Sequence, residues 1–384
     1  MIKRALHTIQ RYRFRHLNIR LIIYVLILCT IGINVIGSAG GKEFQSRQLM
    51  GLIVSICIMA VIAFIDYRFI LKFYWIYYAI NILLLLGVKL FGSTNGGAKR
   101  WIELPGFQLQ PSEWTKLFLI LFFAKLLGKY KDRINNLKFL AILLVLLAVP
   151  AYFIYDQPDL STTIVIVLTY CAIIYLSGLN YKIIGGIVAI IVPIVIILIY
   201  LVMQPNQKIL KDYQYNRIIG FYDENNEDAA KIRYQQENSV LAIGSGGLYG
   251  KGLNNNDITS VKNGDYLSEA HTDFIFTIVG EELGFVGSLS VILLLALIVF
   301  ECFLTGSRAP DLSGKLICCG LGALIGFQSI INLSVVTMLV PNTGLTLPFV
   351  SYGLNSLFGL FACLGTVLNV SLQYKRNYDE EELL

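Results

Sequence analysis

The chain has 384 residues, of which 56% are hydrophobic and only 15% are charged, with a formal net charge of +6. This composition excludes a soluble globular domain and indicates a polytopic membrane protein. Basic residues gather at the ends of apolar runs and not on an aromatic-interleaved surface, so we expect no nucleic-acid binding.

Apolar windows of about 20 residues are long enough to cross a bilayer as helices. They predict an all-α polytopic membrane protein that forms a single domain over residues 1–384. Glycines at 280, 284 and 287 in the long eighth window predict a bend or a close helix contact. The ten expected spans are residues 20–37, 49–65, 73–91, 113–128, 138–155, 161–177, 183–203, 273–304, 315–340 and 348–372.

The distribution of Lys and Arg predicts the orientation of the spans. The N-terminus and alternate short loops carry most of the basic residues, which places both termini in the cytoplasm. Residues 204–270 then form a long extracytoplasmic loop between spans seven and eight. The basic N-terminus leads directly into a full span, so we expect no cleaved signal peptide. Seven cysteines lie in apolar runs without ligand spacing, which is typical of packing residues.

The stretch SEAHTDFIFTIVGEELGFVG, residues 268–287, closes the long loop and opens the eighth span. It places Asp273, preceded by His271 and Thr272, at the membrane edge, where an ionisable group is a functional candidate. The alternative is that Asp273 caps the helix N-terminus. Burial beside Phe274 and Phe276 would raise the pKa of this carboxyl, whereas a nearby lysine would lower it.

The connection between spans three and four carries Lys99, Arg100 and Trp101, followed by Glu113 and Lys116 on one helix face. Arginine and lysine are suitable donors to a phosphate or diphosphate, so these residues are candidates for an anionic headgroup site. The alternative is a structural Glu113–Lys116 pair with Arg100 reaching the headgroups.

Three other outer segments carry candidate residues. Asp159 opens the sixth span and suits either a helix cap or a site residue. The Gly-rich stretch around Ser245 is a weak candidate for holding a phosphate, and its apolar flanks predict that it packs back onto the spans. Prolines and glycines interrupt the sequence between spans nine and ten, which predicts a cavity wall with polar lining from Asn342, Ser351, Tyr352 and Asn355.

Six motifs together resemble one family: GGAKRW, QPSEWTK, QPDLSTT, AIGSGGLYGKGL, EAHTDFIFTIVGEELGFVG and TGLTLPFVSYG. In this order they resemble the SEDS family (shape, elongation, division and sporulation), whose members include RodA and FtsW. The resemblance implies a ten-span peptidoglycan glycosyltransferase that polymerises lipid II at the outer face of the bacterial cytoplasmic membrane. It also implies a class B penicillin-binding protein, the transpeptidase, as partner.

The resemblance places the essential acidic residue of the family on Asp273 and its sensitive tryptophan on Trp101. Short tails favour a RodA-like role in elongation over a role in division. The sequence departs from the family pattern at residues Ser161, Asn238, Ser268, Thr346, Leu354 and Asn355.

The expected chemistry joins a sugar hydroxyl to an anomeric carbon whose leaving group is an undecaprenyl diphosphate. Asp273 is then the general base or a ligand of a divalent cation, Mg or Mn, and no organic cofactor is expected. Arg100, Lys116 and Lys99 hold the diphosphate, while Trp101 and Tyr352 contact sugar or lipid. The remaining candidates for substrate contact are Glu113, Asp159, Ser245, His271, Thr272 and Ser351.

Two other functional classes remain open at this point. A flippase or transporter for the lipid-linked precursor also fits ten spans with broken helices and a buried lysine. A non-catalytic scaffold of a cell-wall synthase is the third alternative. No zinc-protease, Walker or serine-elbow motif supports metal-dependent hydrolysis, ATP hydrolysis or acyl transfer.

Overall fold

A computed structural model describes residues 14–95, 98–104, 107–202, 204, 212–222, 227–255, 260, 264, 267 and 270–373. The first basic residues of the chain and Ser268 lie outside this part. Short 3₁₀ turns occupy Phe14–His16, Leu71–Phe73 and Lys131–Arg133. The remaining elements are α2 (Ile19–Gly40), α3 (Lys42–Ala63), α4 (Tyr67–Ile70), α5 (Tyr74–Phe91), β1 (Ser93–Asn95), β2 (Ala98–Leu104), β3 (Phe107–Leu109), α6 (Pro111–Lys129), α7 (Leu137–Asp156), α8 (Leu160–Leu176), α9 (Tyr181–Val202), α10 (Asp212–Tyr222), α11 (Glu227–Ser245), α12 (Ile275–Ser307), α13 (Leu312–Val336) and α14 (Leu354–Leu372).

Each of the ten expected spans coincides with a helix. Seven segments of the described chain are long and apolar enough to cross a membrane: α2, α3, α4–α5, α7, α12, α13 and α14. The other three expected spans are α6, which carries charged residues, and the shorter apolar helices α8 and α9. Three helix ends differ most from the expected spans, whose bounds were approximate: α3 begins at Lys42, α13 ends at Val336 and α14 begins only at Leu354.

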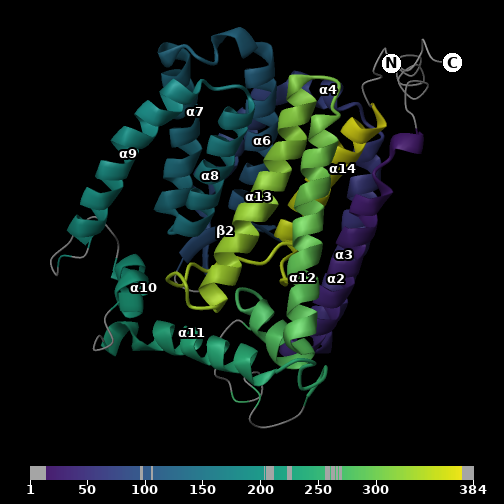
Figure 1. Cartoon of the computed structure of the whole chain (residues 1–384), viewed down its shortest axis with the longest axis vertical. Helices are drawn as coiled ribbons and strands as arrows, with labels where there is room; N and C mark the ends of the chain where they lie inside the picture. Colours follow the sequence, from purple (N-terminus) through teal and green to yellow (C-terminus); the bar gives the residue numbers. More distant parts are fainter. Residues whose placement is uncertain are drawn as a thin grey trace.

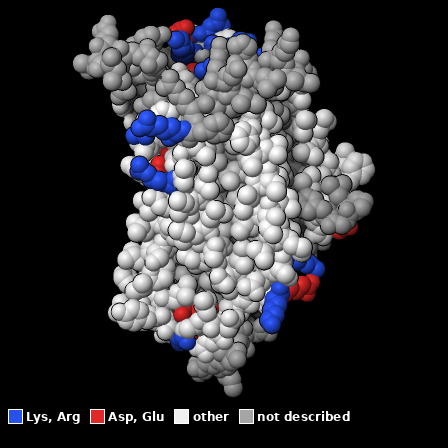
Figure 2. All heavy atoms as spheres, turned by 90° about the vertical axis from the view of Figure 1, so that its right-hand side faces the viewer, with Lys and Arg blue, Asp and Glu red and all other residues white. Residues whose placement is uncertain are grey.

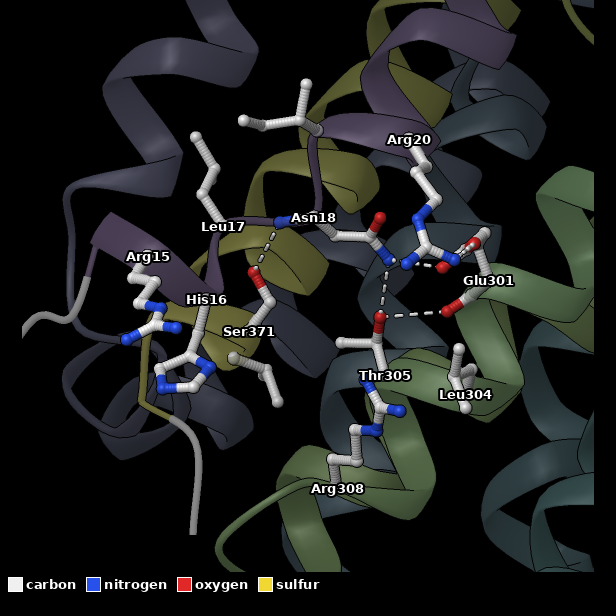
Figure 3. Close-up of a pocket in the computed structure, with 12 residues that line it drawn as sticks. Arg15, His16, Leu17, Asn18, Arg20, Glu301, Leu304, Thr305, Arg308 and Ser371 are labelled. Atoms are coloured by element: carbon white, nitrogen blue, oxygen red, sulfur yellow. Dashed lines mark hydrogen bonds and ion pairs between the residues drawn. The ribbon is translucent and has the colours of Figure 1, made fainter. Parts of the chain in front are cut away.

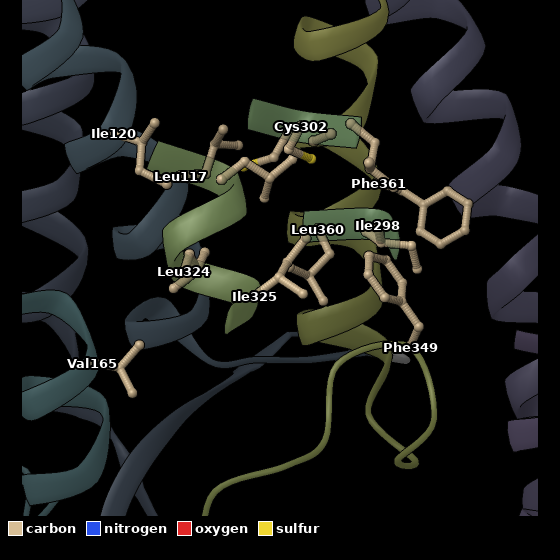
Figure 4. Close-up of a cluster of buried hydrophobic side chains, with 14 of the residues drawn as sticks. Leu117, Ile120, Val165, Ile298, Cys302, Leu324, Ile325, Phe349, Leu360 and Phe361 are labelled. Carbon is tan, nitrogen blue, oxygen red and sulfur yellow. The ribbon is translucent and has the colours of Figure 1, made fainter. Parts of the chain in front are cut away.

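Helix α13 lies in the middle of the bundle and packs against α6, α8, α12 and α14 (Figure 1). Its neighbours contribute the side chains of a continuous apolar core, part of which is drawn in Figure 4, including Leu117 from α6, Val165 from α8 and Ile298 from α12. Because α13 is buried on most sides, polar groups along it must find partners inside the protein.

The outer surface of the bundle is apolar over a broad band. Figure 2 shows one face, on which Lys, Arg, Asp and Glu gather towards the two ends and leave a wide uncharged zone between them. This is the pattern of a surface that faces lipid. The amide of Asn18, just before α2, donates to the Ser371 hydroxyl in α14 at 3.4 Å, so the first and last helices meet at one end.

The connection between α5 and α6 was expected to be a turn-rich loop within an all-α protein, and this was wrong in detail. It forms a small antiparallel sheet in the order β1-β2-β3, with Trp101 opposite Ser93 and Ile102 opposite Leu109. The dipeptides Gly-Gly and Pro-Gly separate the strands in the sequence, and both are strong turn formers.

The long connection between α9 and α12 contains two helices, α10 and α11, and α11 lies across the end of the bundle (Figure 1). Helix α11 is hydrogen-bonded to the end of α13 and to the loop that follows it: the Gln236 side chain donates to the carbonyls of Val335 and Val340 at 2.8 and 2.9 Å. The prediction that this loop packs back onto the spans is therefore confirmed.

Helix α12 is broken at Gly284, whose φ of 64° and ψ of −159° are not helical. Such a break leaves carbonyls before it and amides after it without helical partners. The Gly-rich segment, residues 244–252, supplies hydrogen-bond partners for these groups. The Lys251 and Gly252 amides donate to the Glu281 and Glu282 carbonyls at 2.9 and 3.0 Å. In return the Phe285 and Val286 amides donate to the Gly247 and Leu248 carbonyls at 2.9 and 3.1 Å. The predicted bend is confirmed, and the Gly-rich segment stabilises it.

Candidate functional site

Asp273 lies in a short turn immediately before α12. Residues from α13 and from the loop that follows it hold this turn by hydrogen bonds to its backbone carbonyls. The Asn332 amide group on α13 donates to the Asp273 carbonyl at 2.8 Å. The Ser351 hydroxyl donates to the Thr272 carbonyl at 2.7 Å, and the Tyr352 amide donates to the His271 carbonyl at 3.0 Å. Helix α12 begins at Ile275 with Phe274 in the N-cap position and no capping side chain, so Asp273 is not the N-cap residue.

The loop between α13 and α14, residues 337–353, contacts several other elements at this end of the molecule. The Asn332 side chain also donates to the Leu345 carbonyl at 2.6 Å, and the Ser161 hydroxyl on α8 donates to the Thr343 carbonyl. From α14, Asn355 reaches back to the Gln108 carbonyl of β3 at 2.7 Å. The 337–353 loop and the adjoining start of α14 thus fix the relative positions of the α8 start, the sheet and the Asp273 turn.

Lys116 is almost completely buried, with 4% of its surface exposed. Its ammonium lies 2.8 Å from Glu113 Oε2 and donates to Gln328 Oε1 at 3.1 Å. The Gln328 amide group in turn donates to the Thr346 carbonyl at 2.9 Å. This supports the structural reading of the Glu113–Lys116 pair, because both charges are compensated within the protein.

The Lys116 side chain and the Asp273 turn nevertheless contact the same helix, α13. Gln328 contacts Lys116, and Asn332, four residues further along the same helix, contacts the Asp273 turn. Four residues of α-helix rise about 6 Å, so the two motifs approach α13 about one turn apart.

Arg100 extends from β2 to the start of α8. Its guanidinium donates to the carbonyls of Gln157, at 3.1 Å, and Pro158, and it lies 4.0 Å from Asp159 Oδ2. Asp159 also accepts from the Thr162 amide at 3.2 Å, so the expectation that it caps α8 is confirmed. Arg100 and Asp159, which were predicted from separate motifs, therefore form one cluster.

Arg217 on α10 was not among the predicted site residues. A Cβ atom placed on Gly344 would lie 3.2 Å from Arg217 Nη1 and 3.3 Å from Asp273 Oδ2. The guanidinium and the carboxylate therefore both lie against the same glycine of the 337–353 loop, next to the space that a Cβ atom would fill. Gly344 has a φ of 73°, which a residue with a side chain rarely adopts. The absence of a side chain here leaves room for both groups.

The other predicted residues are placed in different ways. His271 and Tyr352 pack with Phe44 of α3, at ring-centroid distances of 4.4 and 5.0 Å from it. Trp101 lies half-buried in β2. The Lys99 ammonium donates to the Lys89 carbonyl near the end of α5 at 2.9 Å, and the Ser245 hydroxyl donates to the Ala242 carbonyl of its own helix at 2.7 Å.

Comparison with known proteins decides the family. The profile of the family described as "Cell cycle protein", which combines FtsW, RodA and SpoVE, matches residues 14–376. This chain belongs to that family.

Individual members resemble the chain over nearly its whole length. The "Probable peptidoglycan glycosyltransferase FtsW" of Bacillus subtilis is 34% identical and covers 95% of this chain and 93% of its own. The "Peptidoglycan glycosyltransferase MrdB" of Escherichia coli is 32% identical over 94% of this chain and 95% of its own. A solved chain from "Structural coordination of polymerization and crosslinking by a peptidoglycan synthase complex" superimposes with a TM-score of 0.76 at 26% identity, covering 94% of this chain and 97% of that one.

Two buried polar residues of α13 near the Asp273 turn could have been predicted from the sequence but were not. Gln328 and Asn332 are polar, lie four residues apart on one face of α13, and are 0% and 1% exposed. Polar side chains inside an apolar span usually hydrogen-bond across helices or mark a site. Arg217 carries no such signal, because a basic residue in a polar outer loop is ordinary in sequence.

The side chains around Asp273 include a cation but not a set of metal ligands. Within the described part of the chain, no group of three or more His, Cys, Asp or Glu side chains converges to hold an ion. The neighbouring Arg217 guanidinium already supplies positive charge beside the carboxylate. A divalent cation at Asp273 therefore stays an untested prediction, and we derive no step through it.

Proposed function

We propose that this chain is a peptidoglycan glycosyltransferase that polymerises lipid II, with Asp273 as its general base. Membership of the family and the names of its FtsW and MrdB relatives support the activity. The observation that carries the assignment of the base is the Asp273 turn, which is held by α13 and by the 337–353 loop with an arginine beside the carboxylate.

The residues divide the reaction between them. The Asp273 carboxylate takes the proton of the acceptor sugar hydroxyl while the hydroxyl oxygen bonds to the anomeric carbon of the donor. The bond between that carbon and the diphosphate oxygen breaks, and the undecaprenyl diphosphate leaves with the electron pair. Arg217 stabilises the charge that develops on this leaving group, since a guanidinium pairs well with phosphate oxygens.

Arg100 and Lys116 act mainly by holding the site together. Both are engaged with protein partners, Arg100 at the start of α8 and Lys116 with Glu113 and Gln328. Trp101, Tyr352 and His271 offer aromatic faces for a sugar ring or a lipid chain. This differs from the sequence-based expectation, in which Arg100, Lys116 and Lys99 bound the diphosphate directly.

For the membrane topology we propose ten spans, with α6, α8 and α9 added to the seven apolar segments, in the bacterial cytoplasmic membrane. Both termini are then cytoplasmic and the Asp273 site faces outward. The meeting of the first and last helices through Asn18 and Ser371 supports an even number of crossings. The distribution of Lys and Arg supports the direction.

We further propose that a class B penicillin-binding protein is the partner and that the complex serves elongation. The solved relative comes from a study of a synthase complex that couples polymerisation to crosslinking. FtsW and MrdB relatives have similar identities to this chain, so identity does not favour either cellular role. Depletion that widens or rounds the cells supports elongation, whereas filamentation supports division.

The central experiment is polymerisation of lipid II by the purified protein. We expect Asp273→Asn to reduce the rate by about 100-fold or more, since a positioned base contributes 10²- to 10⁴-fold. Asp156→Asn is the matched control, because Asp156 pairs with Lys89 at 3.1 Å at the end of α7 and has no role in the proposed reaction. An Asp273→Asn protein that melts like the parent and polymerises at the parent rate would remove the proposed base.

A further inference from the structure

A cavity of about 230 Å³ lies at the opposite end of the molecule from Asp273. It opens where the start of α2 meets the ends of α12 and α14 (Figure 3). In the proposed topology this end faces the cytoplasm. The residues that line it are Arg15, His16, Leu17, Asn18, Ile19, Arg20, Glu301, Leu304, Thr305, Arg308, Val370 and Ser371.

The floor of this cavity is polar and ordered. Glu301 is only 5% exposed, and its carboxylate accepts from the Asn18 amide group at 2.9 Å and lies 3.7 Å from Arg20. The Asn18 amide group also donates to the Thr305 hydroxyl at 3.0 Å. The one carboxylate of the cavity is therefore compensated by Arg20, which leaves the other cations in excess.

Arg15 and Arg308 are these remaining cations. Among the described residues, no carboxylate lies within ion-pair distance of either. The two arginines come from segments far apart in the sequence and line the same cavity. Other basic residues near this end have partners: Arg68 lies 3.2 Å from Asp311, and Lys129 and Arg133 lie over the Tyr130 ring. A general excess of basic residues on the cytoplasmic side explains their presence. It does not explain why two arginines without a carboxylate partner in the described part of the chain line one cavity with a buried polar floor.

We propose that this cavity binds a phosphate group, carried either by an anionic phospholipid headgroup or by a soluble phosphate. Three arginines against one compensated carboxylate leave a net positive cavity, and guanidinium groups match phosphate oxygens in geometry and charge. The site lies at the ends of spans, where anionic headgroups of the cytoplasmic leaflet attract basic residues. A bound phosphate contacts α2 and α12 together, and α12 is the helix that begins at the Asp273 turn.

Binding to the purified full-length protein tests the proposal. Native mass spectrometry compares retention of phosphatidylglycerol with that of phosphatidylcholine, and calorimetry measures affinity for inorganic phosphate. We expect at least one of the two phosphate sources to bind. The Arg15→Gln/Arg308→Gln variant should weaken this binding by about ten-fold or more, because it removes two charge-assisted hydrogen-bond donors. Retention of phosphatidylglycerol alone identifies a lipid headgroup, whereas affinity for inorganic phosphate identifies a soluble anion.

Two further variants distinguish binding at this cavity from non-specific attraction of phosphate to the basic residues at this end of the protein. Lys131→Gln/Arg133→Gln removes the same number of charges near the same end, and we expect it to bind like the parent. Glu301→Gln removes the negative charge of the cavity, so it should strengthen binding in a way that structural damage would not. The proposal is overturned if neither phosphate source binds, or if the control pair weakens binding as much as the Arg15/Arg308 pair.

Discussion

Arg217 and Lys116 illustrate two different uses of a cation in this protein. Lys116 is buried and its charge is met by Glu113 and Gln328, whereas Arg217 lies half-buried beside the Asp273 carboxylate and Gly344. The half-buried Arg217 guanidinium can contact a substrate, whereas the fully buried Lys116 ammonium cannot do so without a rearrangement of the helices around it. This contrast leads to separate predictions for the two residues.

For Arg217, we expect Arg217→Gln to lower the rate of lipid II polymerisation by about 100-fold, comparable to the loss of one donor that stabilises developing charge. Arg217→Lys should retain part of the activity, because it keeps the charge but not the fork geometry. Arg233→Gln is the control in the same loop, where Arg233 pairs with Glu237 at 3.2 Å. Equal rates for Arg217→Gln and Arg233→Gln would contradict the assigned role.

For Lys116, we expect Lys116→Met to destabilise the protein by about 3–5 kcal/mol, because it leaves the Glu113 carboxylate buried without its partner. The double variant Glu113→Gln/Lys116→Met removes both charges and should recover most of that loss. Thermal unfolding in detergent measures both effects. A double variant that is stable and still polymerises confirms a structural pair. A stable but inactive double variant would instead support the sequence-based prediction that Lys116 binds the diphosphate.

At the scale of elements, the apolar windows predicted the helices well because membrane spans carry a long and uniform signal. The Asp273 turn and the loop between α13 and α14, which were predicted from separate motifs, contact each other in the structure. The sheet and helices α10 and α11 were not predicted, since short outer elements depend on what they pack against. Arg217 reaches Asp273 only through this tertiary arrangement, so no pattern in the chain could have paired them.

The Gly-rich segment gives a prediction at this scale. A Cβ on residue 246 would overlap the Gly280 carbonyl oxygen, whereas a Cβ on residue 244 meets nothing within 4 Å. We expect Gly246→Ala to separate the segment from the α12 break, to destabilise the protein by about 1–3 kcal/mol and to reduce polymerisation. Gly244→Ala should match the parent in melting temperature and rate. A Gly246→Ala protein with parent-like stability would show that this contact does not hold the bend.

At the scale of the whole molecule, one end of the bundle carries the Asp273 site and the opposite end carries the arginine-lined cavity. Helix α12 connects them, from Ile275 at one end to Arg308 just beyond the other. The charged groups of both ends are separated by the apolar band of Figure 2. Such an arrangement has a definite direction in a membrane, and the direction is open to measurement.

Thiol labelling in intact cells measures this direction. The seven native cysteines lie within expected spans, and five of them are buried, so reaction with a membrane-impermeant maleimide should be weak in the parent. Ser245→Cys places an exposed thiol at the end of α11, and we expect it to be labelled in intact cells because it faces outward. Lys131→Cys, in the turn between α6 and α7, should be labelled only after the membrane is permeabilised. The reverse pattern would place the Asp273 site in the cytoplasm, where a polymerase of outward-facing lipid II has no access to its substrate.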